Sequence, residues 1–185
     1  MSGLTPNGTD AGRVASLLLV EDNPADVKIM QRALAHAEGR VELVVLRDGQ
    51  EAVDYLLRQG AYAPRGVASA KAGSYPRSEP GEGPTVQVLP APPAWRRPDL
   101  IVLDLNLPLL TGIEVLKLIR SVPPLSLIPV VILSTSRRPE EVHEAYAAGA
   151  NTYIEKPFDF DRFVTILRTL QQYWLEIAVL PPPMA

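Results

Sequence analysis

The sequence predicts an α/β fold in which a five-stranded parallel sheet lies between two layers of helices, a doubly wound, three-layer arrangement. Short, continuous apolar runs of strand length alternate with segments whose apolar residues recur at helical spacing. Strands that are apolar along their whole length are typical of a parallel sheet covered on both faces. The chain has 185 residues, 46% of them hydrophobic, which suits one domain with a proper core.

The first part of the chain is expected to supply two strand–helix units. Strands are predicted over 16–20 and 41–46, and each is followed by an amphipathic helix. Asn23-Pro24 predicts the start of the first helix, because asparagine is a good N-cap and proline suits the first helical position. The second helix is expected over 50–58. The residues predicted to face inward are Val27, Met30, Leu34 and Ala37 in the first helix and Val53, Leu56 and Leu57 in the second.

Residues 60–98 have a different character. Eight prolines and five glycines interrupt this stretch, and it has little periodicity. Such a segment cannot easily bury enough apolar surface to order itself. We expect a long mobile loop inserted in one domain over 15–173, between a disordered tail over 1–14 and an extension over 174–185.

The second part of the chain is expected to supply three more strands, over 100–103, 129–133 and 152–155. Thr111 and Glu114 form the pattern of a capping box, which predicts the start of the third helix. A fourth helix is expected over 139–148, ended by Gly149, and a fifth over 162–174. The predicted inward residues are Ile113, Leu116 and Ile119 in the third helix and Phe163, Ile166, Leu167, Leu170 and Trp174 in the fifth.

Composition excludes several classes of function. The chain has no cysteine, so it has no disulfide framework, thiolate zinc site or cysteine nucleophile. Its net charge is −3 and no basic patch stands out, so a nucleic-acid partner is not expected. The apolar run over 17–20 is too short to span a membrane, and we expect a cytoplasmic protein without a membrane partner. His36 and His143 have no metal-ligand spacing, and neither is assigned a function.

Polar side chains follow the predicted strands at their carboxyl ends. Glu21 and Asp22 follow the first strand, Asp104 the third, Ser134 the fourth and Lys156 the fifth. In an open parallel sheet these ends share one edge, where ligands bind. The sequence therefore predicts one site with three carboxylates, a hydroxyl and an ammonium.

Three neighbouring carboxylates repel one another, at about 4 kcal/mol for two unit charges 4 Å apart and an effective dielectric near 20. A divalent cation removes this cost, and a site made only of oxygen ligands favours Mg²⁺. A carboxylate beside Mg²⁺ can attack a phosphoryl group and form an acyl phosphate. We therefore expect Asp104 to be the nucleophile, with Lys156 and Ser134 binding the added oxygens.

Four separated motifs, LLLVEDNPAD, VLDLNLPLLTG, PVVILSTS and NTYIEKPF, closely resemble those of the receiver domain of two-component response regulators. The resemblance implies a flavodoxin-like sheet of strand order 2-1-3-4-5 and a cis bond between Lys156 and Pro157. It implies that Asp104 accepts the phosphoryl group and that Ser134 and Tyr153 form a switch. The implied Mg²⁺ ligands are Glu21, Asp22, Asp104 and the backbone carbonyl of Asn106.

VEDNPADVKIMQRAL and YWLEIAVLP further resemble single-domain regulators that are paired with phytochrome histidine kinases. This likeness implies a signalling protein that is phosphorylated by such a kinase, that slowly hydrolyses its own acyl phosphate, and that signals by protein contacts. It also implies a homodimer through the face made by the helix over 139–148, the strand over 152–155 and the helix over 162–174, aided by the extension over 174–185.

Other interpretations stay open from the sequence. A phosphorylation-independent interaction module could use the same fold, although the acidic pair, Asp104 and Lys156 speak against it. A flavin-binding protein of flavodoxin-like topology would need a phosphate-binding loop after the first strand, where this chain has the acidic EDNPAD. Asp26 is expected to be a surface residue that complements the helix dipole. Residues 95–97, Trp-Arg-Arg, are read as a solvated loop end rather than a docking patch.

Overall fold

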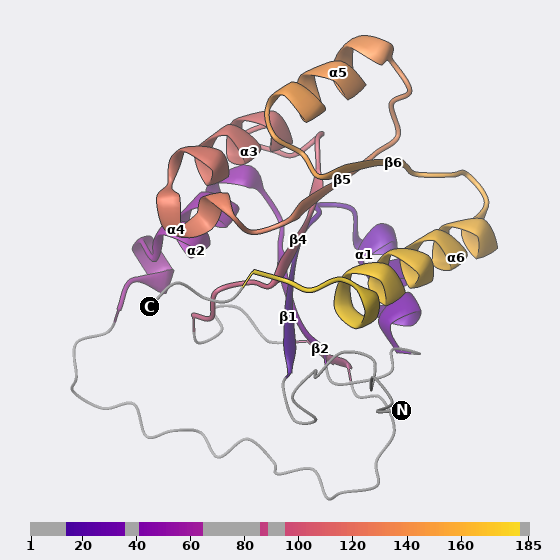
Figure 1. Ribbon diagram of the computed structural model, residues 1–185, viewed down its shortest axis with the longest axis horizontal. Coiled ribbons are helices and arrows are strands. Elements are labelled where there is room, and N and C mark those ends of the chain that lie inside the picture. The colour runs from indigo at the N-terminus through magenta and orange to yellow at the C-terminus, as the bar shows by residue number, and fades with distance from the viewer. Residues whose placement is uncertain (1–13, 36–40, 65–85, 89–94, 182–185) are drawn as a thin grey trace, which may run out of the picture.

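The computed structural model describes residues 14–35, 41–64, 86–88 and 95–181. These residues form one parallel sheet with helices on both sides (Figure 1). Its strands are β1 (Ala15–Val20), β2 (Val41–Leu46), β3 (Val86–Val88), β4 (Leu100–Asp104), β5 (Val130–Ser134) and β6 (Thr152–Glu155). The helices are α1 (Pro24–Leu34), α2 (Gly49–Leu57), α3 (Gly112–Ser121), α4 (Pro123–Ser126), α5 (Pro139–Ala147) and α6 (Phe160–Gln171). A 3₁₀ turn, η1 (Gly60–Tyr62), follows α2, and π-helical turns, η2 (Gln172–Ile177), follow α6.

The predicted sheet is confirmed, with one addition. The strand order is β3-β2-β1-β4-β5-β6, so the five predicted strands lie in the expected order 2-1-3-4-5. The prediction of five strands was one short, because β3 pairs in parallel with β2 at the edge of the sheet. This strand lies inside the segment that was expected to be a loop throughout. Three residues within a proline- and glycine-rich segment are too few to show a strand period.

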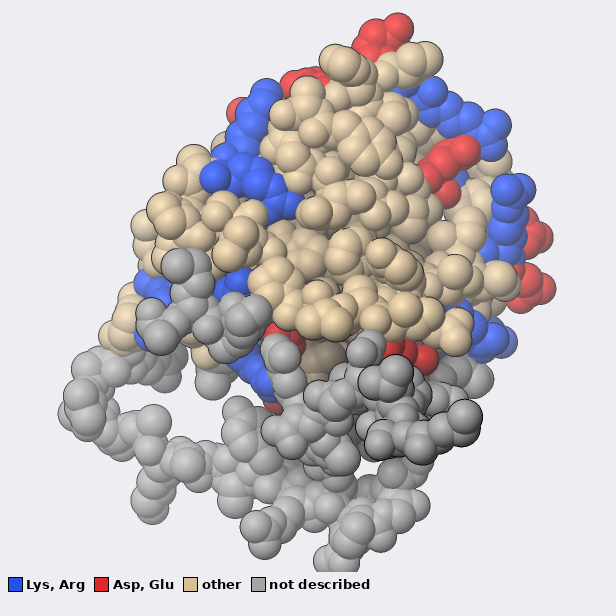
Figure 2. Space-filling model, viewed as in Figure 1, with Lys and Arg blue, Asp and Glu red and all other residues tan. Residues whose placement is uncertain are grey.

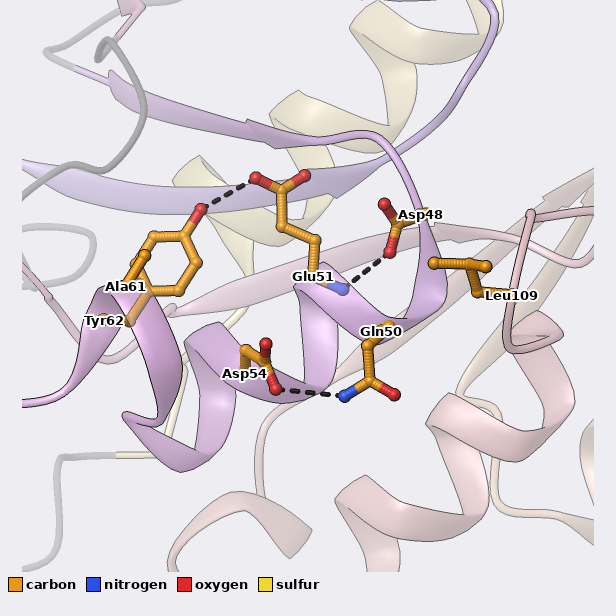
Figure 3. Close-up of a pocket in the computed structure, with 7 residues that line it drawn as sticks. All are labelled: Asp48, Gln50, Glu51, Asp54, Ala61, Tyr62 and Leu109. Atoms are coloured by element: carbon orange, nitrogen blue, oxygen red, sulfur yellow. Dashed lines mark hydrogen bonds between the residues drawn. The ribbon is translucent and has the colours of Figure 1, made fainter.

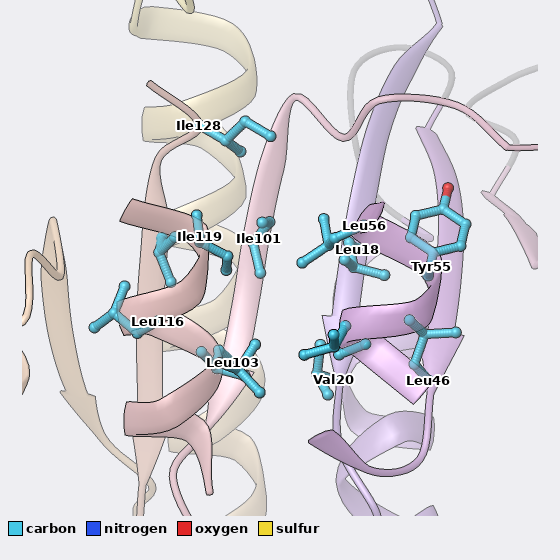
Figure 4. Close-up of a cluster of buried hydrophobic side chains, with 14 of the residues drawn as sticks. Leu18, Val20, Leu46, Tyr55, Leu56, Ile101, Leu103, Leu116, Ile119 and Ile128 are labelled. Atoms are coloured by element: carbon cyan, nitrogen blue, oxygen red, sulfur yellow. The ribbon is translucent and has the colours of Figure 1, made fainter. Parts of the chain in front are cut away.

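The helices of the two layers come from different parts of the chain. Residues of α1 and α6 pack on one face of the sheet, and residues of α2, α3, α4 and α5 pack on the other. Figure 4 shows part of the second cluster, where Leu18 of β1 and Ile101 of β4 lie among α2 and α3 side chains. Along β1, Leu17 and Leu19 belong to one cluster while Leu18 and Val20 belong to the other. This alternation explains the unbroken apolar runs of β1, β4 and β5, because both faces of these strands are covered by helices.

The predicted helix starts are confirmed by their hydrogen bonds. The Asn23 side chain accepts a hydrogen bond from the amide of Ala25, and Pro24 is the first residue of α1. Thr111 and Glu114 form the capping box of α3. Two further caps were not predicted: the side chains of Asp48 and Asp159 accept hydrogen bonds from backbone amides in the first turns of α2 and α6.

The predictions for helix extents were less accurate. The expected last helix, over 162–174, is α6 followed by the π-helical turns of η2, and the short helix α4 was not predicted. Four residues expected to face inward are only partly buried: Leu57, Ile113, Ile166 and Trp174. Ala37, His36, the tail over 1–13 and most of the insert lie outside the described residues. Among the helices that the structure describes, none has the length and apolar character needed to cross a membrane.

Candidate functional site

The strand order brings the predicted site residues to one edge of the sheet. Asp104 is the last residue of β4 and Ser134 the last residue of β5, and these two strands are neighbours. Glu21 directly follows β1, which pairs with β4 on the side opposite to β5. Lys156 directly follows β6, which pairs with β5. All four side chains are buried.

The ammonium group of Lys156 lies at the centre of this cluster. Its Nζ donates to Glu21 Oε2 at 2.6 Å, to Asp104 Oδ2 at 2.6 Å and to Asp26 Oδ2 at 2.9 Å. The side chains of Lys156 and Glu21 are only 5% and 1% exposed. Each of the three ammonium protons therefore has a carboxylate acceptor, and the lysine joins β1, β4 and α1.

Burial and charge act in opposite directions on these groups. Burial by itself lowers the pKa of Lys156, but the charge and hydrogen bond of Asp104, and then those of Glu21, outweigh it and raise that pKa above its ordinary value. Burial raises the pKa of Glu21 to about 7, against the opposing hydrogen bond and charge of Lys156. The lysine is therefore a permanent cation at neutral pH.

Three carboxylates of the cluster suit a divalent cation. Glu21, Asp22 and Asp104 each offer one oxygen, and these oxygens lie within 4.8 Å of one another. Asp22 is exposed, so water can reach the same place and complete the octahedral shell that Mg²⁺ requires. The residues therefore fit Mg²⁺ or Mn²⁺. The amide of Asn106 donates to Asp104 Oδ1 at 2.9 Å, and the role of its carbonyl as a ligand stays a prediction.

The two expected switch residues are linked through the loop that follows β5. Ser134 Oγ accepts a hydrogen bond from the amide of Ser136 at 3.2 Å. The phenol of Tyr153, which is half-buried, donates to the carbonyl of Ser136 at 2.9 Å. The amide of Lys156 donates to the carbonyl of Ser134 at 2.8 Å. Ser134 is therefore linked through Ser136 to Tyr153, and its carbonyl is bound to the backbone of Lys156.

Two expectations about single residues were wrong, one at this edge and one at the opposite edge, where β1, β2 and β4 begin. Asp26 is 18% exposed and hydrogen-bonded to Lys156, so it is part of the cluster and not only a surface complement to the helix dipole. Residues 95–97 are packed rather than solvated. The guanidinium of Arg58 stacks 4.6 Å from the centre of the Trp95 ring, and Arg96 pairs with Glu42 at 2.8 Å.

A pocket of about 360 Å³ lies at the start of α2, apart from the Lys156 cluster (Figure 3). It is lined by Asp48, Gln50, Glu51, Asp54, Ala61, Tyr62 and Leu109. Tyr62 donates to Glu51 Oε1 at 2.9 Å and Gln50 donates to Asp54 Oδ1 at 3.0 Å. Burial, and then the bond to Glu51, raise the pKa of Tyr62. None of the lining residues belongs to the Lys156 cluster.

Comparison with known proteins identifies the family. The model of the response regulator receiver domain matches residues 92–168. Response regulator Rcp1 of Synechocystis sp. is 33% identical over 165 residues, which cover 89% of this chain and 92% of Rcp1. The chain belongs to the response regulator receiver family. Proteins of this family are signalling proteins, and the resemblance predicted from the four motifs is confirmed.

Solved structures agree with this assignment. The crystal structure of the phosphorylated cyanobacterial phytochrome response regulator RcpA is 37% identical with a TM-score of 0.73, covering 92% of this chain and 100% of that one. The Mn²⁺-bound form of Rcp1 is 32% identical with a TM-score of 0.72, covering 91% of this chain and 99% of that one. Receivers bind such cations at an acidic pocket, and the acidic group at Glu21, Asp22 and Asp104 is of this kind.

Proposed function

We propose that this receiver takes a phosphoryl group from a histidine kinase onto Asp104. One observation carries the proposal: Asp104 shares a cation-sized group of oxygens with Glu21 and Asp22, while its Oδ2 accepts a hydrogen bond from Lys156. Glu21, Asp22, Asp104 and the backbone carbonyl of Asn106 would hold Mg²⁺. When bound, Mg²⁺ neutralises negative charge on the transferring phosphoryl group.

In the transfer, a carboxylate oxygen of Asp104 forms a bond to phosphorus. The bond from phosphorus to the kinase's histidine nitrogen breaks, and the imidazole leaves with the electron pair and takes up a proton. Lys156 is already beside Asp104 and can pair with a phosphoryl oxygen without leaving the cluster. The hydroxyl of Ser134 would donate to a second oxygen, and water would later hydrolyse the acyl phosphate slowly.

Phosphorylation would change the neighbouring elements α5 and β6 through Ser134 and Tyr153. The added group brings negative charge and strong hydrogen-bond acceptors, which attract the Ser134 hydroxyl. Ser134 and Tyr153 both bind Ser136, so the two are coupled before any phosphoryl group arrives. The equilibrium between conformations of α5 and β6 would shift, and the output would be a protein contact.

The partner kinase is proposed to be of the phytochrome type. The RcpA structure is described as that of a phytochrome response regulator, and the chain matches it over that protein's full length. Such a partnership would place this receiver in the cytoplasm.

We also propose that a second copy of this chain covers the face formed by α5, β6 and α6. An apolar groove of about 280 Å³ lies there, lined by Thr152, Ile154, Thr165, Ile166, Thr169, Leu170, Tyr173 and Trp174. Tyr173 of the groove is 51% exposed, and Ile177 and Val179, which follow it in the chain, are 57% and 85% exposed. Figure 2 shows uncharged surface across the middle of this view, with acidic and basic side chains along its right-hand rim. Light scattering on wild type and on Ile177→Asp tests this, and a wild-type monomer at all concentrations would contradict it.

The phosphoryl site is tested by incubation with acetyl phosphate and Mg²⁺, followed by Phos-tag electrophoresis. Wild type should give a shifted band, and Asp104→Asn should not, because the amide keeps the shape but lacks the nucleophile. Asp161→Asn, which changes an exposed carboxylate of α6, is the matched control and should shift as wild type does. An unshifted wild type would favour the phosphorylation-independent module, and a shifted Asp104→Asn would refute the site. Transfer from candidate kinases then identifies the partner.

A further inference from the structure

Lys156 and a divalent cation need the same two carboxylates. Glu21 and Asp104 supply oxygens both to the lysine ammonium and to the group of three that suits a cation. Asp26 differs from them, because it binds Lys156 at 2.9 Å but is not part of the cation group. Asp26 belongs to α1, whereas Glu21 directly follows β1 and Asp104 is the last residue of β4. Asp26 therefore binds Lys156 without being one of the three carboxylates that suit a cation.

We propose that Asp26 is a positioning residue that retains the Lys156 ammonium when the oxygens of Glu21 and Asp104 turn toward Mg²⁺. The inference rests on the proposed function, since it concerns the same cation site. A lysine that is only 5% exposed pays a large desolvation cost for its charge unless carboxylates remain around it. With Asp26 present, one charged hydrogen bond persists throughout, and the ammonium stays close enough to meet an incoming phosphoryl oxygen.

Without the carboxylate of Asp26, the ammonium would depend on Glu21 and Asp104 alone. It would then compete with Mg²⁺ for those oxygens, and the affinity for Mg²⁺ would fall. We expect Asp26→Asn to weaken Mg²⁺ binding about tenfold, the size expected for one lost charge-assisted hydrogen bond. Loss of a negative charge near the cation would also weaken binding, so the experiment must separate the two causes.

A double-mutant cycle separates them. Mg²⁺ affinity is measured by calorimetry for wild type, Asp26→Asn, Lys156→Met and the double variant, with Asp161→Asn as the surface control. If Asp26 acts through the lysine, Asp26→Asn should change the affinity less than about twofold once Lys156 is removed. An equal loss in both backgrounds would show a general charge effect and would overturn the inference.

A second measurement does not depend on the folding of Lys156→Met. In protein with ¹⁵N-labelled lysine, the Lys156 ammonium signal should stay protected from exchange with water at saturating Mg²⁺ in wild type and lose that protection in Asp26→Asn. Equal protection in both would contradict the inference. A wild type that binds no Mg²⁺ would instead refute the proposed function, so the two failures are distinguishable.

Discussion

The hydroxyl of Tyr146 lies 3.2 Å from the backbone nitrogen of Tyr153 and accepts its hydrogen bond. Tyr146 belongs to α5, and Tyr153 belongs to β6, the last strand in the sheet order. Among the described residues no further strand pairs with β6, so its outward-facing amides need other acceptors, and here a side chain is the acceptor. Tyr153 is thus held at its backbone by α5 and at its phenol by Ser136.

Replacing Tyr146 by phenylalanine should release the Tyr153 amide. The ring is kept and only the acceptor is lost, so we expect a stability loss of about 0.5–1.5 kcal/mol and an exchange rate of that amide raised about fivefold or more. Hydrogen exchange followed by NMR measures the exchange rate of the Tyr153 amide. Tyr173→Phe, at a half-exposed tyrosine of η2, is the control and should leave that amide unchanged. Equal exchange rates in wild type and Tyr146→Phe would mean that the hydroxyl does not hold the edge.

Arg120 of α3 should be a major contributor to stability. Its guanidinium donates to the carbonyls of Gly149, Ser126 and Ile128 and to the side chain of Asn151, at 2.8 to 3.0 Å. Arg120→Met should lower the free energy of unfolding by about 2–4 kcal/mol, because partly buried carbonyls lose a charged donor. Urea denaturation measures the change. Arg162→Met, on an exposed position of α6, should cost less than about 0.5 kcal/mol. Similar losses for both variants would contradict this role.

Features that depend on local pattern could be predicted from the sequence. The core strands were found because both of their faces are covered, which makes every residue apolar, as in Leu100 to Leu103 of β4. The helix starts at Asn23 and Thr111 were found because a cap lies within a few residues of what it binds. The convergence of Glu21, Asp104 and Lys156 followed from parallel strands ending at one edge.

Features that depend on distant partners could not be predicted. Asp26 and Lys156 are 130 residues apart, and an acidic residue in a first helical turn has an adequate local explanation without any partner. Three of the four acceptors of Arg120 are backbone carbonyls, which every residue type has and which a sequence pattern therefore cannot distinguish. Strand β3 is defined by its pairing with the edge of β2, and its own three residues are too few to show the alternation of a strand.

Gly112 should be essential to the placement of Asp104. A Cβ at Gly112 would lie 2.1 Å from the carbonyl oxygen of Asp104 and 2.8 Å from the Cα of Leu105, and both are backbone atoms that cannot rotate away. Although alanine normally suits a helix better than glycine, Gly112→Ala should destabilise the fold by about 1–3 kcal/mol and slow phosphorylation of Asp104. Thermal denaturation and acetyl phosphate labelling measure these effects. Lys117→Ala, on the exposed side of α3, is the control. If Gly112→Ala were as stable as wild type, the backbone at Asp104 and Leu105 would be able to move aside for the added Cβ.

The capping box of α3 should make stability depend on pH through Glu114. The amide and the hydroxyl of Thr111 both donate to Glu114 Oε2 at 2.8 Å, and these bonds lower the pKa of Glu114 below its ordinary value of 4.5. Because the carboxylate is favoured in the folded state, its contribution is present above the unfolded pKa and is lost as pH falls through the folded pKa. The difference in melting temperature between wild type and Glu114→Gln should therefore be largest near neutral pH and vanish in acid. Glu140→Gln, at an exposed glutamate in the first turn of α5, should show a smaller difference at neutral pH. The melting temperatures of wild type and Glu114→Gln could instead differ by the same amount from neutral pH into acid. That result would mean that the ionised carboxylate is not what stabilises the cap.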